Sequence, residues 1–289
     1  MSVTRILVLG SSGMLGHKVK DYLINESDYK VYDISRGKNK DKYSLFCDIY
    51  DTQKLNKLIK EIRPDIIVNC IGVLIKGSQD IKNATYVNAK FPHYLKKIAL
   101  RYSFKLIHIS TDCVFSGTIG KYKENDKRDG FGTYAETKKF GEIIDDSNLT
   151  LRTSIVGPEL KPDGEGLFNW FMSQENDVNG YLNSIWSGVS TLELSKSIKW
   201  AIDADVNGLY HITNNSSISK FELLRLFKKY TKKNIGIMPF DNERIDKSLL
   251  DTRNLIDYEI PSYEQIVKDL VYDLKKNIKK YPHYQKFID

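Results

Sequence analysis

Cysteine is scarce in this sequence, and histidine is nearly as rare. Among 289 residues there are five histidines and three cysteines, Cys47, Cys70 and Cys113. The cysteines are odd in number, lie in or beside apolar runs, and form neither a C-x-x-C pair nor a group with histidines. This pattern disfavours a disulfide framework and a zinc site, so we expect reduced, buried thiols and no bound metal.

Long hydrophobic runs are also missing. The longest apolar stretch, residues 66–75, is interrupted by Asn69 and is far shorter than the roughly 20 residues of a membrane span. The chain passes from Met1 to a short apolar strand within a few residues, which is too short for a signal peptide. The sequence therefore predicts a soluble, cytoplasmic protein that has no membrane partner.

The charge balance is only mildly basic. The chain has 44 Lys and Arg against 37 Asp and Glu, a formal net charge of +7, and lysines gather in the tail around residues 275–286. Such a run is usually a solvated helix face. A nucleic-acid surface would need clustered arginines with interleaved aromatic residues, and no such pattern occurs. A mild positive potential instead suits an anionic small substrate.

In the first half of the chain, short β-branched runs alternate with segments of helical period. We expect strands at residues 3–9, 30–34, 43–47, 65–69 and 104–110, and helices at 14–24, 51–62 and 84–102. Within 51–62 the apolar residues recur at i, i+3, i+4 and i+7, which places them on one helix face. Strands that alternate with helices imply right-handed βαβ units, so we predict an α/β fold with a doubly wound parallel sheet.

The alternation becomes less regular after Arg152. Gly157-Pro158 interrupts the chain, and we expect helices at 164–174, 191–202, 221–230 and 262–278, with a strand at 208–213. For this length, one large domain and a smaller one are the natural expectation. We place the first domain at residues 1–156, with 188–214 returning to it, and a smaller C-terminal α/β lobe mainly at 157–289.

A glycine-rich turn follows the first expected strand, in the sequence Gly10-Ser11-Ser12-Gly13-Met14-Leu15-Gly16. Gly10 permits a tight turn, Gly13 lets the backbone approach a pyrophosphate, and Gly16 lets the following helix lie close to the strand. The pyrophosphate would sit at the helix N-terminus, where free N–H groups favour negative charge. Glycine turns are common, but a position between strand and helix favours a dinucleotide site in a Rossmann-type domain. The expected binding residues are Gly10, Ser12, Gly13, Met14, Leu15 and Gly16.

The end of the second strand selects between the two nicotinamide dinucleotides. A carboxylate at this point would bind the ribose hydroxyls and repel a 2′-phosphate. The residues there are Ser35 and Arg36, with Lys38 and Lys40 nearby. Because an arginine fork grips phosphate, NADP is favoured. NAD stays open, since a shift of register would make Asp33 the ribose ligand.

Two further segments carry candidate catalytic groups. Tyr134 and Lys138 are four residues apart at the start of an expected helix, so they share a face. A free tyrosine has a pKa of roughly 10, and a nearby cation lowers that pKa, as general acid–base catalysis requires. Thr111 follows a strand, at the sheet edge where ligands bind in open α/β sheets. Each feature also has a plainer interpretation: two surface residues, and a strand-end hydroxyl bonded to backbone.

The order of these motifs resembles the dTDP-4-dehydrorhamnose reductases, which are extended short-chain dehydrogenases. The motifs are GxxGxxG, S-T-D-x-V-F from Ser110, G-x-Y-x-E-x-D from Gly120, Y-x-x-x-K with Gly141-Glu142, and Leu151-Arg152-Thr153-Ser154. The resemblance implies a triad of Thr111, Tyr134 and Lys138, with Lys138 also holding the nicotinamide ribose. It further implies that Asp48 and Ile49 contact the adenine and that Cys70, Ile71 and Gly72 line the cofactor.

This resemblance implies an NADPH-dependent reductase of a nucleotide-linked 4-keto-6-deoxy sugar, acting in deoxysugar and polysaccharide biosynthesis. Residues 1–156 would bind the cofactor and the C-terminal lobe the nucleotide sugar, with a homodimer as the default assembly. Two departures, Ile155 for the family's Trp and Leu249 for its Arg, are expected in the sugar-nucleotide pocket, so the sugar need not be rhamnose. A nucleotide-sugar epimerase and a non-catalytic regulatory subunit remain alternatives. A dehydratase is disfavoured because Cys113 follows Asp112 where dehydratases have Glu.

Overall fold

The chain folds into two compact units, seen here in a computed structural model that describes residues 3–37, 42–253 and 258–288. The first unit comprises residues 1–110, 132–152 and 198–210. The second unit comprises residues 111–131, 153–197 and 211–289. Each unit is therefore assembled from segments that are distant in the sequence.

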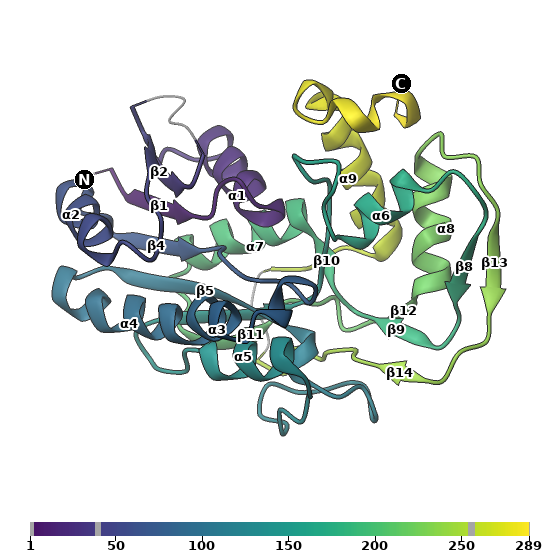
Figure 1. The fold of residues 1–289 in the computed structure, drawn as a ribbon, viewed down its shortest axis with the longest axis horizontal. Helices are drawn as coiled ribbons and strands as arrows, with labels where there is room; N and C mark the ends of the chain where they lie inside the picture. Colours follow the sequence, from purple (N-terminus) through teal and green to yellow (C-terminus); the bar gives the residue numbers. More distant parts are fainter. Residues whose placement is uncertain (1–2, 38–41, 254–257, 289) are drawn as a thin grey trace. The chain divides into compact units, whose positions relative to one another are not determined.

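A twisted sheet forms the centre of the first unit (Figure 1). Among the described residues it has seven strands in the order β11-β6-β5-β4-β1-β2-β3, and every pair from β5 to β3 is parallel. The strands are β1 (Arg5–Leu9), β2 (Lys30–Ser35), β3 (Ser44–Phe46), β4 (Ile66–Asn69), β5 (Lys105–Thr111), β6 (Leu149–Thr153) and β11 (Gly208–His211). The carboxyl ends of β5, β4, β1, β2 and β3 therefore meet at one edge.

Helices cover both faces of this sheet. Alternate strand residues, such as Leu7 and Leu9, pack in one apolar cluster with α2 (Thr52–Ile62) and α4 (Phe91–Tyr102). The intervening residues Ile6 and Val8 point to the opposite face and are also fully buried. Helix α1 (Met14–Asn25) packs against β1 and β2 and supplies the buried Leu15, Val19 and Leu23. The predicted doubly wound α/β fold is confirmed.

One expected helix is interrupted. Residues 84–102 were expected to form a single helix, whereas the structure has α3 (Ile81–Ala84), a π-helical turn η2 (Thr85–Lys90) and then α4. Pro92 lacks the N–H that would bond the carbonyl of Asn88 in a regular α-helix. The wider turn accommodates this missing donor, and π-helical turns of this kind are frequent near functional sites.

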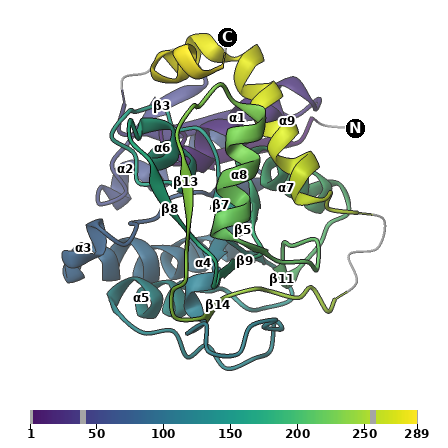
Figure 2. The same cartoon turned by 90° about the vertical axis from the view of Figure 1, so that its right-hand side faces the viewer.

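The described part of the second unit contains small sheets and amphipathic helices. Helix α8 (Lys220–Tyr230) packs against β8 (Val178–Tyr181) and β13 (Ile237–Phe240), as Figure 2 shows. Ser262 caps α9 (Tyr263–Lys276) by accepting a hydrogen bond from the N–H of Gln265. The remaining elements of the chain are η1 (Gly77–Gln79), η3 (Asp112–Val114), α5 (Thr133–Gly141), β7 (Ile155–Val156), α6 (Leu167–Ser173), β9 (Ser184–Trp186), β10 (Val189–Ser190), α7 (Thr191–Asp203), β12 (Ile218–Ser219), β14 (Ile245–Asp246), η4 (Ile278–Lys280) and η5 (Pro282–Phe287).

The helices of the described residues are too short or too polar to cross a membrane. Those residues also contain no group of three or more His, Cys, Asp or Glu side chains arranged to hold a metal ion.

Candidate functional site

The glycine-rich turn is tight, and two of its glycines are required by the backbone. Gly10 has φ +85°, and a Cβ at this position would lie 2.8 Å from Cγ1 of Ile71. At Gly16 a Cβ would lie 2.2 Å from the carbonyl oxygen of Gly10, so α1 packs directly on the turn. Gly13 is the N-cap of α1 and has no side chain, so it makes no capping hydrogen bond of the usual kind. The N-terminus of α1 is therefore open to an anionic group.

A cavity of about 200 Å³ adjoins this turn in the first unit. All of the predicted cofactor residues line it except Met14, Leu15 and Gly16, which form the first turn of α1. The lining residues are Gly10, Ser12, Gly13, Ile34, Ser35, Arg36, Cys47, Asp48, Ile49, Tyr50, Cys70, Ile71, Gly72, Val73, Asn83 and Val87. They come from the carboxyl ends of four neighbouring strands, β1 to β4, and from the segment that follows β4. Tyr134 and Lys138 are not among them.

Asp33 does not face this cavity, although Ser35 and Arg36 do. Asp33 is 3% exposed, its carboxylate lies 2.6 Å from the ammonium of Lys20, and it accepts hydrogen bonds from the hydroxyls of Ser44 (2.6 Å) and Ser11. Its charge is thus engaged by α1, β3 and the glycine turn. Lys38 and Lys40, which the sequence places near Arg36, lie outside the described residues.

Sequence reasoning missed an aromatic side of the cavity. The ring of Tyr50 stacks on that of Tyr86, with 4.4 Å between centroids, and its hydroxyl donates to Oδ1 of Asn83 at 2.6 Å. Burial and the negative charge of Asp48 raise the pKa of Tyr50. A tyrosine two residues beyond Asp48 at a strand end was a usable signal for this position. Asn83, on a separate helix, offered no such signal.

Two other predicted cofactor residues have defined local roles. The carboxylate of Asp48 accepts a hydrogen bond from the N–H of Tyr50 at 3.1 Å, which shapes the turn after β3. Burial raises the pKa of the Cys70 thiol to about 12, so this cysteine is a neutral thiol near pH 7. Both Asp48 and Cys70 line the cavity.

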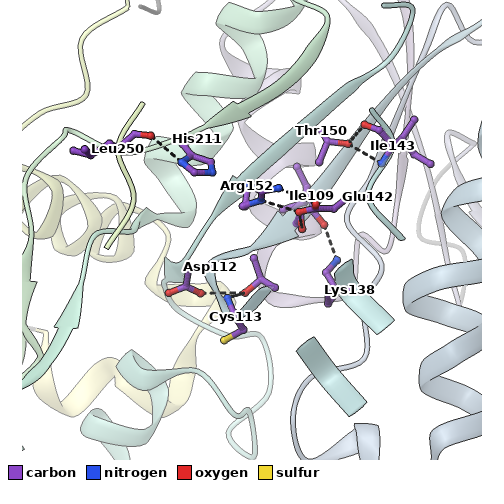
Figure 3. A network of polar contacts seen from close by, with 12 residues as sticks. Ile109, Asp112, Cys113, Lys138, Glu142, Ile143, Thr150, Arg152, His211 and Leu250 are labelled. Atoms are coloured by element: carbon purple, nitrogen blue, oxygen red, sulfur yellow. Dashed lines mark hydrogen bonds and ion pairs between the residues drawn. The ribbon is translucent and has the colours of Figure 1, made fainter. Parts of the chain in front are cut away.

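Helix α5 carries Tyr134 and Lys138 one turn apart in the first unit. Lys138 is 5% exposed, and its ammonium donates to the carbonyl of Ile109 on β5 at 2.7 Å (Figure 3). Burial lowers the pKa of Lys138 to about 8, while the negative charge of Glu142 opposes this shift. Near pH 7 the side chain is therefore mainly a charged ammonium, fixed in place by the strand beside it.

Thr111, at the end of β5, belongs to the second unit. It is 7% exposed, and its hydroxyl donates to Oδ1 of Asp112 at 3.1 Å and accepts from the N–H of Cys113 at 3.2 Å. The hydroxyl can hydrogen-bond a substrate oxygen if it turns away from Asp112. Burial raises the pKa of the Cys113 thiol to about 11, so Cys113 has no thiolate character near pH 7.

Ile155 and Leu249, the two residues that depart from the pattern of the resembled family, lie in different environments. Ile155 is half-buried in β7, which pairs with β10. Leu249 is 1% exposed and packs with Val114, Phe115 and Tyr122, so it is a core residue rather than a wall of a pocket. The expectation that both lie in a substrate pocket is therefore wrong for Leu249.

Comparisons with known proteins place the chain in a family. The sequence model described as RmlD substrate binding domain matches residues 4–274. A dTDP-4-dehydrorhamnose reductase of Aggregatibacter actinomycetemcomitans is 27% identical over 236 residues, and the match covers 76% of each protein. The methionine adenosyltransferase 2 subunit beta of Xenopus laevis is 22% identical over 237 residues, covering 76% of this chain and 70% of that protein.

Solved structures show the same fold. The dTDP-4-dehydrorhamnose reductase of Bacillus anthracis str. Ames, in complex with NADP, superposes with a TM-score of 0.81 at 21% identity. The superposition covers 94% of this chain and 100% of that structure. With nearly its whole length matched, the chain belongs to the RmlD substrate binding domain family and has the extended short-chain dehydrogenase fold.

Proposed function

We propose that the chain is an NADPH-dependent reductase that transfers hydride to the C4 ketone of a nucleotide-linked 4-keto-6-deoxy sugar. The observation that carries the proposal is the buried Lys138 ammonium on α5, one turn after Tyr134. A cation placed one helical turn from a phenol stabilises the phenolate, and this is the tuning that a tyrosine proton donor needs. Relatives named as dTDP-4-dehydrorhamnose reductases support this class of substrate.

The cavity beside the glycine turn is our proposed site for the dinucleotide. The open N-terminus of α1 would bind the pyrophosphate, and the Tyr50 side of the cavity, with Asp48 and Ile49, would hold the adenine. Arg36 would bind a 2′-phosphate, because Asp33 is turned inward and cannot repel it. The nicotinamide, when bound, supplies the hydride.

The chain's own side chains would handle the substrate oxygen. Thr111 and Tyr134 would donate hydrogen bonds to the ketone oxygen, where negative charge develops during reduction. Tyr134 would then pass its proton to that oxygen, and Lys138 would keep the pKa of the phenol low while holding the nicotinamide ribose. Residues 157–289 would supply most of the sugar-nucleotide site.

The direct test is the decay of NADPH absorbance with a panel of dTDP-, UDP- and GDP-linked 4-keto-6-deoxy sugars. We expect one member to be reduced, which would also name the nucleotide and the sugar. If NADPH binds tightly and no sugar is reduced, the reductase assignment is wrong. Product analysis without net oxidation of cofactor would then identify an epimerase.

A regulatory subunit is the second candidate, because one group of relatives is named as the beta subunit of methionine adenosyltransferase 2. Such subunits have no need of a proton donor, whereas Thr111, Tyr134 and Lys138 are all retained in this chain. Tight NADPH binding without turnover of any sugar, together with capture of a partner enzyme, would favour a regulatory subunit over a reductase.

Replacing Arg36 should change cofactor selectivity. Loss of a charge-assisted bond to phosphate costs about 1.5–3 kcal/mol, so Arg36→Ala should weaken NADPH binding roughly 10- to 100-fold and leave NADH nearly unaffected. Calorimetric titration with both cofactors measures this. Arg101→Ala, at the exposed end of α4, is the matched control and should change neither affinity. Comparable efficiency of the unmodified protein with NADH and NADPH would refute the NADP assignment.

A further inference from the structure

A buried ion pair stands behind the helix that carries Tyr134 and Lys138. The side chains of Glu142 and Arg152 are 0% and 1% exposed. Arg152 donates from Nε to Oε1 and from Nη2 to Oε2 of Glu142, both at 2.8 Å (Figure 3). The hydroxyl of Ser110 adds a 2.6 Å hydrogen bond to Oε1. A buried pair of this kind contributes little net stability compared with apolar residues of similar size. Stability alone therefore does not account for it.

The pair connects α5 to the same strand that receives Lys138. Lys138 lies in the last turn of α5, and Glu142 is the C-cap residue that ends the helix, so both are at its C-terminal end. Lys138 donates to the carbonyl of Ile109, and Glu142 accepts from the hydroxyl of Ser110, the next residue of β5. Arg152, on the neighbouring strand β6, holds the other oxygen of Glu142. These contacts fix the rotation of α5 against the sheet.

The charges around Lys138 favour a role for Glu142 in its protonation. Burial disfavours the ammonium, and Glu142 is the charge that opposes this effect. His108, on β5, is fully buried, and burial together with the Lys138 charge lowers its pKa well below the usual range, so it is neutral near pH 7. His93, on α4, contacts the carbonyl of Phe140, and the cationic Arg152 is bonded directly to Glu142. Among these groups, Glu142 is therefore the negative charge that favours the ammonium form of Lys138.

We propose that Glu142, clamped by Arg152 and Ser110, is a positioning residue that keeps Lys138 charged and seated on the Ile109 carbonyl. The catalytic consequence rests on the proposed reductase function; the charge state of Lys138 does not. Loss of the Glu142 charge removes an interaction that favours the ammonium, so Lys138 should release its proton at lower pH. Near neutrality the phenol of Tyr134 would then lose its cationic neighbour.

The test measures the Lys138 titration directly, in protein labelled with ¹³Cε lysine and without cofactor or substrate. The signal is assigned by its loss in Lys138→Met. Glu142→Gln should lower the titration midpoint of Lys138 by about one pH unit. Glu193→Gln is the matched control, since Glu193 is another buried carboxylate, 3% exposed and paired with Lys196 in the second unit. It should leave the midpoint where it is.

A second variant guards against misfolding, because Glu142→Gln leaves the Arg152 cation buried without its carboxylate. The double variant Glu142→Gln/Arg152→Gln removes both charges, and its Lys138 midpoint should also fall. An unchanged midpoint in either folded variant overturns the proposal. The catalytic consequence is tested by measuring kcat/KM against pH. The alkaline limb of this profile should move to lower pH by the same amount as the Lys138 midpoint. An unmoved limb refutes the claim that Glu142 affects catalysis through Lys138. If the unmodified protein reduces no sugar, the proposed function fails while the titration still decides the role of Glu142.

Discussion

Tyr134→Phe should abolish turnover while leaving NADPH binding nearly intact. The change removes one hydroxyl, which in the proposed mechanism both hydrogen-bonds the ketone oxygen and delivers the proton to it. General acid catalysis contributes about 10²–10⁴-fold, and a donor to a developing oxyanion contributes about 10²–10³-fold. We therefore expect kcat to fall by at least about 10³-fold. The decay of NADPH absorbance, with the keto sugar that the unmodified protein reduces as substrate, measures this. The NADPH dissociation constant should stay within about twofold, because Tyr134 does not line the cavity beside the glycine turn.

The matched control is Tyr102→Phe, which removes a phenol hydroxyl from the end of α4 in the same unit. This variant should keep the activity of the unmodified protein. Turnover by Tyr134→Phe within about tenfold of the unmodified protein would show that another group delivers the proton. Equal losses of turnover and of NADPH binding would indicate a damaged cofactor site instead, and would equally contradict the assigned role.

Much of the cavity beside the glycine turn was predictable because it depends on local sequence. Strands such as β1 and β4 are short apolar runs buried on both faces, which the sequence displays directly. Once such strands are parallel, their carboxyl ends must meet at one edge of the sheet. Residues as distant in sequence as Gly10, Arg36, Asp48 and Cys70 therefore gather at one cavity.

Other features depend on contacts that no local pattern contains. From the sequence alone, Asp33 could either face the cofactor ribose or point away from it. Its inward position depends on contacts with Lys20, Ser44 and Ser11, each supplied by a different segment. In the second unit, β8 and β13 pair across almost 60 residues, with Val178 opposite Ile237. Strands of only four residues are too short for their alternation to be recognised before their partners are known.

The π-helical turn is a third feature that the sequence alone does not predict. A proline within an apolar helical pattern indicates a possible break, but its consequence here depends on what packs against the turn. Helix α5 lies against η2, and Asn88 in that turn bonds the N–H and the carbonyl of Val73 at 2.8 and 3.0 Å and the hydroxyl of Thr137 at 3.2 Å. The geometry of the helix that carries Tyr134 and Lys138 is thus set partly by a side chain that sequence reasoning did not single out.

Gly141→Ala should strongly destabilise the first unit, for a reason that follows from this contact. A Cβ at Gly141 would lie 1.8 Å from the carbonyl oxygen of Asn88 and 2.9 Å from its carbonyl carbon. The obstacle is backbone, and the hydrogen bonds of the Asn88 side chain prevent the turn from moving aside. Overpacking against such a rigid neighbour costs typically 1–3 kcal/mol and occasionally more, and we expect about 3 kcal/mol or more here. Chemical denaturation measures the change in the free energy of unfolding.

Gly132→Ala, at the opposite end of the same helix, separates steric overlap from backbone strain. Gly132 has φ +86° and ψ 159°, a backbone conformation that is almost exclusive to glycine, but a Cβ there would meet nothing within 4 Å. Its replacement should therefore cost only the backbone strain, about 1–3 kcal/mol. A loss of stability in Gly141→Ala no larger than in Gly132→Ala would contradict the close packing of α5 on the π-helical turn. If the expected difference is found, Gly141 lets α5 approach the turn; the proposed role of Glu142, to fix the helix against β5 and β6, is tested separately by the Lys138 titration. Both contacts would then maintain the position of the Lys138 ammonium.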